Sequence, residues 1–223
     1  LQYESVCSTE GPNLIIAGAG TGKTKVLTTR VAHIIDNNLA FPSQILCVTF
    51  TNKAAREMSE RVQKLVSQNM EKMPWMGTFH SIGAKIIRNH AEVIGLKQSF
   101  TILDKDDQLS LIKQIIKAEN LDQSQFSPKL IQSKIDHWKN KALNPNDIKS
   151  ESLDNLVDEK SLSIYKIYQA RLFEINCLDF GDLLLQCINL FKVPDIHKRY
   201  SNNFKYIHVD EYQDTNAAQY KWL

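Results

Sequence analysis

The sequence predicts an α/β fold of the P-loop type, in which a parallel sheet is interrupted by an inserted, mainly helical subdomain. In the first 90 residues, three apolar runs of strand length are each followed by a helical pattern. A glycine-rich turn joins the first run to its helix, and strand-like runs nearly vanish from about residue 92 until residues 206–210. We therefore expect a sheet domain in residues 1–90, a helical insertion in residues 91–200 and a returning strand in residues 201–223.

The composition excludes several classes of protein. Lysine and arginine number 27 against 25 aspartates and glutamates, so the net charge is only +2 and any nucleic-acid site must be a local surface. The four cysteines have no C-x-x-C spacing, which favours free thiols in a reducing cytoplasm over disulfides or zinc. No apolar run approaches the ~18 residues of a membrane helix, so we expect no membrane partner. Because the chain lacks an initial methionine and stops within a pattern, we expect a fragment of something longer.

Each element of the expected sheet domain has a local signal. The strands are continuous apolar runs, and the helices carry apolar residues at helical spacing behind capping residues such as Thr51. The strands are expected at residues 13–17, 44–50 and 75–80, and their helices at residues 25–35, 52–66 and 81–90. A parallel sheet of this kind is covered by helices on both faces, and it places ligands at the C-terminal ends of its strands.

The glycine-rich turn has the residues of a phosphate-binding loop, or Walker A motif. Its glycines let the backbone fold closely and point N–H groups inward, while the following helix adds the positive potential of its N-terminus. Lys23 can reach the outer phosphates of a nucleotide, and Thr24 is placed to bind Mg²⁺. The usual first glycine of the motif is replaced by Ala17. The alternative is a glycine-rich loop between a core strand and a core helix that binds no ligand.

The middle of the chain reads as a series of amphipathic helices. Ser127 and Pro128 form the start of one of them, because serine caps a helix and proline suits its first position. The helices are expected at residues 107–118, 128–138, 162–175 and 180–191. We expect Pro194 to end the series.

Strand character returns at residues 206–210, where an apolar run ends in Asp210 and Glu211. An acidic residue at this position can hold Mg²⁺ beside Thr24, and a second carboxylate can polarise an attacking water. Near the N-terminus, Gln2 carries an amide that can pair with an adenine edge. The alternative for Asp210 and Glu211 is an acidic turn that only caps the strand. We read His208 as an ordinary strand residue.

Five segments together resemble the ordered motifs of UvrD/Rep-type superfamily 1 DNA helicases. These segments are residues 17–24, 48–58, 77–80, 178–184 and 209–216. The resemblance spans essentially the whole chain and implies the first RecA-like core domain, with its helical insertion. Two positions differ from the usual motifs, because Lys25 stands where many members have arginine and Gly181 replaces an acidic residue or alanine.

The resemblance also implies a role for individual residues. The implied nucleotide-binding residues are Gln2, Ala17, Gly18, Ala19, Gly20, Thr21, Gly22, Lys23, Thr24 and Lys25. Thr24 and Asp210 would be the magnesium ligands. Glu211 would be the catalytic base, and Lys23 would act beside it on the phosphates. Gln213 would sense the state of the nucleotide. The segments that line the single-stranded DNA track in the family contain Phe50, Thr51, Asn52, Thr78, Phe79 and His80. Aromatic rings stack on bases of any sequence, which suits Phe50 and Phe79, although both are also typical core residues.

The leading interpretation is therefore the N-terminal part of an ATP-dependent 3′-to-5′ DNA helicase of the repair class. Its expected ligands are ATP and Mg²⁺, and its expected partners are single-stranded DNA, single-strand/duplex junctions and a second RecA-like domain that this chain lacks. We expect a cytoplasmic monomer. The alternative from another class is a truncated module that binds nucleotide or single-stranded DNA without turnover. A P-loop kinase is a third option, but no lid or phosphoacceptor segment supports it.

Overall fold

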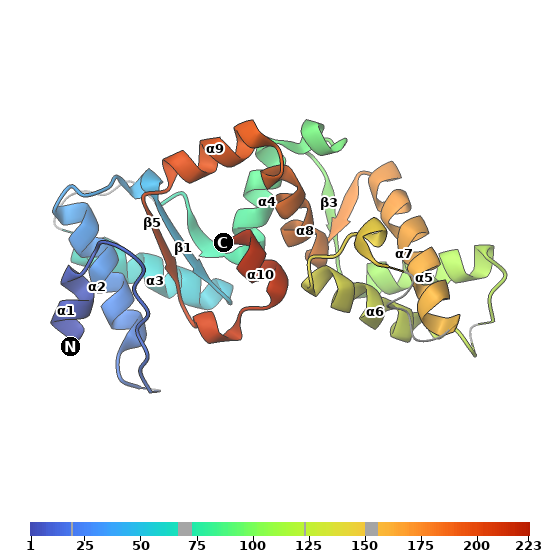
Figure 1. The fold of residues 1–223 in the computed structure, drawn as a ribbon, viewed down its shortest axis with the longest axis horizontal. Coiled ribbons are helices and arrows are strands. Elements are labelled where there is room, and N and C mark those ends of the chain that lie inside the picture. The colour runs from blue at the N-terminus through green and yellow to red at the C-terminus, as the bar shows by residue number, and fades with distance from the viewer. Residues whose placement is uncertain (19, 67–72, 123, 150–155) are drawn as a thin grey trace. The chain divides into compact units, whose positions relative to one another are not determined.

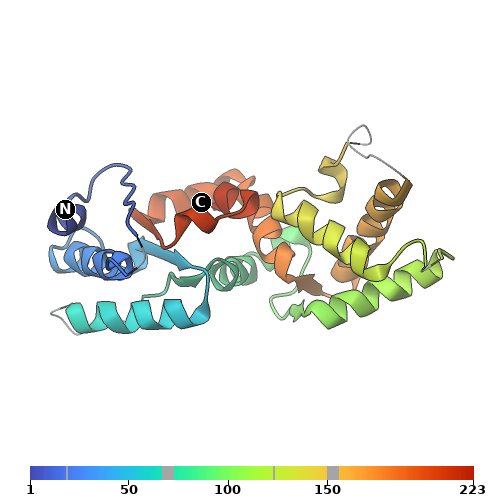
Figure 2. The same cartoon turned by 90° about the horizontal axis from the view of Figure 1, so that it is seen from below.

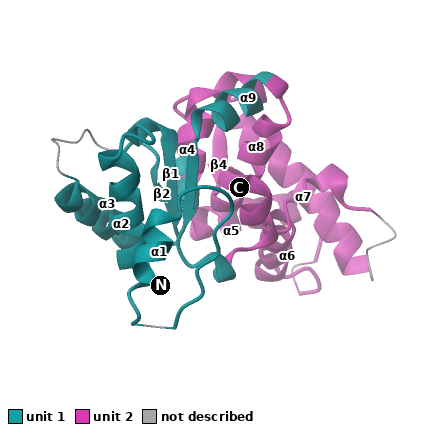
Figure 3. Cartoon of the chain, turned by 60° about the vertical axis from the view of Figure 1, so that its left-hand side comes forward, with its two compact units in different colours: residues 1–82, 195–214 teal, residues 83–194, 215–223 magenta. Residues whose placement is uncertain are grey.

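A computed structural model describes residues 1–18, 20–66, 73–122, 124–149 and 156–223 (Figure 1). The described chain forms two compact units (Figure 3). The first unit contains residues 1–82 and 195–214, and the second contains residues 83–194 and 215–223. The chain thus crosses between the units at residues 82, 194 and 214, whereas the predicted domain boundaries lay at residues 90 and 200.

The first unit is built on a three-stranded parallel sheet, in the order β2–β1–β5. The central strand β1 (Ile45–Thr49) is buried at every residue because it has a neighbour on each edge and helices above its face. It pairs with β2 (Met76–Thr78) on one side and with β5 (Tyr206–Val209) on the other. The parallel α/β fold class that the sequence predicts is therefore confirmed for this unit.

Helices pack on this sheet in layers. Figure 2 shows α1 (Gln2–Cys7) against α2 (Lys23–Asp36), and α2 against α3 (Asn52–Leu65). Two further helices are α4 (Phe79–Asn89), which begins here and continues into the second unit, and α9 (Pro194–Asn203). Short 3₁₀ turns occur at Pro42–Gln44 and Tyr212–Asp214. The core residues between α2, α3 and the sheet are Val31, Ala32, Ile34, Ala40, Ile45, Cys47, Met58, Val62, Val66 and Met73.

The predicted strand at residues 13–17 is wrong in this structure. These residues have no regular secondary structure, and Leu14 and Ile16 are 73% and 88% exposed. A strand requires a neighbour that satisfies its backbone N–H and C=O groups, and none of the described strands lies beside this segment. The apolar side chains therefore have no sheet to pack against.

Two predicted boundaries also need correction. The strand expected at residues 75–80 ends at Thr78, and Phe79 and His80 form the first turn of α4. Pro194 was expected to end the helical series, but it starts α9 instead. Proline fits the first turn of a helix because the N–H that it lacks has no partner within the helix there.

The second unit is mainly helical, as predicted, but it contains a small sheet that the sequence analysis missed. Strands β3 (Thr101–Leu103) and β4 (Cys177–Asp179) pair in parallel although they are far apart in sequence. The helices of this unit beyond α4 are α5 (Lys105–Ala118), α6 (Pro128–Asn140), α7 (Leu156–Glu174), α8 (Phe180–Phe191) and α10 (Ala217–Trp222). Single 3₁₀ turns lie at Ala91–Ile94 and Pro145–Asp147. The bounds of α8 match the prediction. No helix was predicted at α10, whose residues were assigned to the same domain as the returning strand but belong to the second unit.

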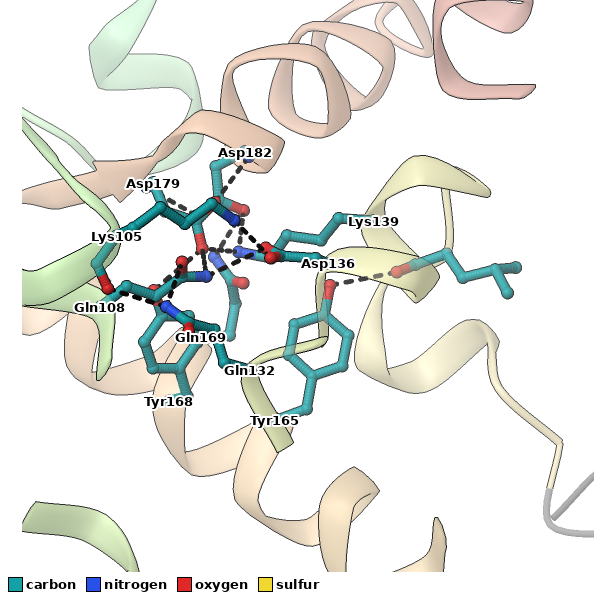
Figure 4. Close-up of polar contacts among 11 residues, drawn as sticks. Lys105, Gln108, Gln132, Asp136, Lys139, Tyr165, Tyr168, Gln169, Asp179 and Asp182 are labelled. Carbon is teal, nitrogen blue, oxygen red and sulfur yellow. Dashed lines mark hydrogen bonds and ion pairs between the residues drawn. The ribbon is translucent and has the colours of Figure 1, made fainter. Parts of the chain in front are cut away.

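A buried ionic cluster lies at the ends of the strands in the second unit (Figure 4). The Lys139 ammonium is 2.7 Å from a carboxylate oxygen of Asp179 and 2.8 Å from one of Asp182. All three side chains are at most 2% exposed. Tyr168 and Gln108 also donate hydrogen bonds to Asp179, and Gln169 donates one to Asp182, so the cluster joins four helices and β4. Such a cluster must be fully paired, because each buried charge without a partner costs several kcal/mol, of order 3–5.

The described cysteines are free, with Cys47, Cys177 and Cys187 buried and Cys7 exposed. Among the described helices, none is both long enough and apolar enough to cross a membrane.

Candidate functional site

The candidate site lies at the C-terminal edge of the sheet in the first unit. Because β1, β2 and β5 are parallel and in register, the residues that follow them meet at this edge. The register places Thr49 beside Thr78 and Val48 beside Val209. The predicted DNA segments after β1 and β2 therefore lie next to each other, and the Asp210–Glu211 pair follows the strand on the other side of β1.

The phosphate loop requires glycine at two positions for conformational reasons. Gly20 and Gly22 have φ angles of +75° and +91°, in the left-handed region that side chains disfavour. Gly22 caps α2, so the free N–H groups of the first helical turn follow directly after the loop. The Thr21 hydroxyl donates to the Gly18 carbonyl oxygen at 2.6 Å and closes the turn. These features agree with a loop that binds an anion at the helix N-terminus. The predicted residue Ala19 lies outside the described residues.

Lys23 and Glu211 meet across the site. The Lys23 ammonium lies 3.6 Å from a Glu211 carboxylate oxygen and donates to the Ala17 carbonyl oxygen at 3.3 Å. The Gln213 side-chain amide donates to the same Glu211 oxygen. The amide of Gln213, followed by the charge of Lys23, lowers the pKa of Glu211, so this carboxylate is ionised and able to accept a proton.

The backbone of Glu211 is held in an uncommon conformation. Its φ angle is +51°, which costs about 1–3 kcal/mol for a residue other than glycine. The hydrogen bond from the Asp214 N–H to the Glu211 carbonyl oxygen closes the turn in this conformation. Strain of this kind clusters at functional sites, where the surrounding structure holds a side chain in a required direction.

Asp210 and Thr24 have the chemistry of a magnesium site. Burial, and then the charge of Glu211, raise the pKa of Asp210, so this carboxylate lies in a place that disfavours a lone negative charge. A bound divalent cation would reverse that effect. A carboxylate and a hydroxyl are hard oxygen ligands, which suit Mg²⁺ together with water and phosphate oxygens. The residues present therefore fit the ion.

Gln2 lies against the phosphate loop. Its amide nitrogen donates to the Thr21 carbonyl oxygen at 3.0 Å and lies close to Gly22. Gln2 and Lys25 line one part of a groove of about 470 Å³ between α1 and α2. The structure therefore brings Gln2 and Lys25, two of the predicted nucleotide-binding residues, together beside the phosphate loop.

The two predicted stacking residues differ in exposure. The rings of Phe50 and Phe79 lie 5.6 Å apart between centroids and are tilted by 59°. Phe50 is half-buried, but Phe79 is only 1% exposed. A base cannot lie on a ring that has no exposed face, so this structure favours the core alternative for Phe79, and its contact with DNA stays a prediction.

Two threonines of the predicted DNA track, Thr51 and Thr78, hydrogen-bond to neighbouring backbone groups. Thr51 caps α3 by accepting from the Ala54 N–H, and Asn52 is exposed beside it. Thr78 is buried and accepts from the Ser81 N–H. Burial lowers the pKa of the partly buried His80, which is therefore neutral at pH 7 and can still donate one hydrogen bond.

The sequence analysis missed two charged groups that the structure buries. Arg30 on α2 is 6% exposed, and burial, followed by the charge of Arg30, lowers the pKa of His208 on β5 to about 4. The second group is the Lys139 cluster. Burial alone would lower the pKa of Lys139, but Asp179 and Asp182 outweigh it and raise that pKa. The sequence signalled these burials only through spacing, because Arg30 and Lys139 each follow a buried apolar residue of the same helix by four positions.

The comparisons with known proteins agree across the chain. The family model described as the UvrD/REP helicase N-terminal domain matches residues 1–223. A Staphylococcus aureus protein named ATP-dependent DNA helicase PcrA is 49% identical over 220 residues, which is 98% of this chain and 30% of that protein. Proteins of the same name from Leuconostoc citreum and Staphylococcus epidermidis are each 47% identical over 98% of this chain. The chain spans about 30% of the length of these curated relatives.

Proposed function

Since the chain belongs to the UvrD/REP helicase N-terminal domain family, we propose that it is the ATP- and DNA-binding part of an ATP-dependent DNA helicase. The observation that carries this proposal is the meeting of Lys23 and Glu211, 3.6 Å apart, at the C-terminal edge of a parallel sheet. One residue follows a phosphate loop and the other follows a strand that ends in acidic residues. The structure thus places a phosphate-binding cation and a candidate base for the attacking water at one site, as hydrolysis of a nucleoside triphosphate needs.

In the proposed reaction, each residue has a separate task. The N–H groups of the loop and Lys23 bind the phosphates, so Lys23 exchanges its contact with Glu211 for one with the nucleotide. Thr24 and Asp210 would hold Mg²⁺, which neutralises phosphate charge when it is bound. Glu211 accepts a proton from the attacking water. The Gln213 amide, which donates a hydrogen bond to the Glu211 carboxylate, holds that carboxylate in place.

The DNA partner of this proposal is a single strand across the ends of β1 and β2. Phe50 would stack on a base, while Thr51 and Asn52, exposed beside it, would contact phosphates. Such contacts are independent of base sequence, which suits a motor that moves along any strand. The family resemblance adds four properties to the proposal. They are movement in the 3′-to-5′ direction, action in DNA repair, a preference for single-strand/duplex junctions and a monomeric state.

The proposal assigns only part of a catalytic centre to this chain. In the family that the motifs resemble, a second RecA-like domain supplies arginines that close on the γ-phosphate. Without such groups, turnover should fall on the order of 10³-fold or more. The competing function is a module that binds nucleotide or single-stranded DNA and does not hydrolyse ATP.

A nucleotide titration tests the proposed site directly. We expect Lys23→Ala to weaken binding of a fluorescent ATP analogue with Mg²⁺ by tenfold or more, since a phosphate contact of this kind contributes about 1.5–3 kcal/mol. Lys198→Ala is the matched control, because Lys198 is an exposed lysine on α9 of the same unit and lies outside the site. Equal affinities of the folded wild type and Lys23→Ala would refute the assignment.

Steady-state ATPase assays with and without single-stranded DNA separate the two functions. In a chain joined to its second core domain, Glu211→Gln should retain nucleotide affinity and lose at least ~10²-fold in turnover, because an amide cannot accept the proton. Turnover above about a tenth of the wild-type value would contradict the role of Glu211 as a general base.

A further inference from the structure

Helix α1 carries Gln2, but it has little packing of its own to hold it in place. It is six residues long, and none of its residues is buried. A helix this short is not stable in isolation, because nucleation costs more than one turn of hydrogen bonds returns. The position of α1 must therefore depend on specific contacts with the rest of the unit.

Arg30 supplies one such contact from α2. Its guanidinium donates to the Ser5 carbonyl oxygen at 2.6 Å, across 25 residues of sequence. Arg30 is only 6% exposed, and no carboxylate in the described part of the chain forms an ion pair with it. A buried arginine without an anionic partner is costly, so its place at the end of α1 calls for an explanation.

Two further hydrogen bonds fasten the same segment. The Tyr206 hydroxyl on β5 donates to the carboxylate of Glu10, which lies just after α1, at 2.9 Å. The Gln2 amide reaches the phosphate loop at Thr21. α1 is thus tied to the loop at its start, to α2 at Ser5, and to β5 through the residues that follow it.

We propose that Arg30 is a positioning residue for base recognition, which holds α1 on α2 so that the Gln2 amide faces the nucleobase. Ser5 lies three residues after Gln2, so the anchor is one helical turn from the amide that it positions. Gln2 uses one amide N–H on Thr21 and keeps its second N–H and its carbonyl oxygen for a ligand. That donor and acceptor match the paired acceptor and donor that adenine presents, and they mismatch guanine.

Arg30 acts at a distance from the reaction. It stands seven residues after Lys23 on α2, about 10 Å along the helix at 1.5 Å per residue. It therefore lies too far along α2 to bind the phosphates, and its effect on the ligand must pass through α1. Loss of Arg30 should accordingly change which base is preferred and leave the strength of phosphate binding intact. The inference rests on the nucleotide site proposed above.

The test compares two fluorescent nucleotides that differ only in the base. We expect the wild type to bind the ATP analogue more tightly than the GTP analogue. In Arg30→Met, the ratio of the two dissociation constants should fall about fivefold or more, because base contacts of this kind discriminate by about 1–3 kcal/mol. The affinity for the GTP analogue and for inorganic tripolyphosphate should stay within twofold. Gln2→Ala should produce the same pattern, and the double variant should add nothing to it.

Arg199→Met is the matched control, since it removes an exposed arginine of α9 in the same unit. Arg30→Lys is a second variant that keeps the charge, but its side chain ends about one bond short of the Ser5 carbonyl oxygen. We expect a smaller fall of the same ratio in Arg30→Lys, and this variant decides the matter if Arg30→Met does not fold.

An unchanged ratio in folded Arg30→Met, or in Arg30→Lys when only that variant folds, overturns the inference. An equal loss of affinity for the ATP analogue, the GTP analogue and tripolyphosphate also overturns it, because a purely structural role predicts that result. The proposed nucleotide site fails in a different way, namely when Lys23→Ala leaves all three affinities unchanged.

Discussion

Phe79 provides the sharpest test of the candidate DNA surface. Its ring is 1% exposed and packs against Phe50 at 5.6 Å, so Phe79→Ala removes a buried ring from the core. Such a truncation costs about 3–5 kcal/mol of unfolding free energy. For a protein of this length, each kcal/mol lowers the melting temperature by about 2–4 °C, so we expect a fall of roughly 6–20 °C. Phe79→Leu keeps most of the apolar volume and should lose on the order of 1 kcal/mol.

Thermal melts and anisotropy titrations on a short single-stranded oligonucleotide measure the two effects separately. Phe50→Ala should weaken DNA affinity by about 1–3 kcal/mol, the range for one stacked base, with a smaller change in melting temperature. Phe79→Leu should leave the affinity of the folded protein within twofold of the wild type. Phe41→Ala is the matched control, because Phe41 is 73% exposed and precedes β1, at the end of the strand opposite to the candidate DNA surface.

One result would refute this reasoning. If Phe79→Leu melts close to the wild type but loses fivefold or more in DNA affinity, the ring must be accessible to a base. The burial of Phe79 would then belong only to the state without DNA. Affinity should also fall with rising salt in every variant that still binds, because lysines and arginines release counterions from the phosphates.

Three predictions concern the buried cluster of the second unit. Lys139→Met should lower the free energy of unfolding in urea by about 3–5 kcal/mol, because it leaves the carboxylates of Asp179 and Asp182 buried without their cation. The same change at the exposed Lys113 is the control and should cost less than 1 kcal/mol. Burial and the charge of Asp179 raise the pKa of Asp182 to about 6 from 3.8, so its contribution to stability is present at low pH and is lost as the pH rises from about 4 through 6. The contribution of Asp182 should appear as a difference between the wild type and Asp182→Asn in how the free energy of unfolding changes across that range, with the wild type losing more stability as the pH rises. Gly181→Ala should destabilise by about 1–3 kcal/mol in thermal melts, because the new Cβ would lie 2.8 Å from Lys139 Cδ, which is buried and cannot move away.

Several local features of this protein were readable from the sequence. The glycine-rich turn before α2, the strand–helix units β1–α3 and β2–α4 and the bounds of α8 follow from backbone sterics and from the spacing of apolar residues, which act within a few residues. The parallel order also placed Asp210 and Glu211 at the same sheet edge as the segments after β1 and β2. The roles of individual site residues remain predictions.

Contacts between distant segments were decided only by the tertiary structure. Residues 13–17 have the composition of a strand, but a strand forms only where another backbone satisfies its hydrogen bonds, and the described sheet offers no neighbour there. The pairing of β3 with β4 joins residues more than 70 positions apart, and their short runs carry no signal of it.

The burial of charged side chains was only weakly indicated by the sequence. Lys139 and Arg30 lie at the helical spacing of buried positions, but that spacing names no partner for either charge. Their partners are two carboxylates 40 and 43 positions further along the chain, and a backbone carbonyl 25 positions earlier. A charge can be buried only where such partners converge, and that convergence depends on how the helices pack and not on local pattern.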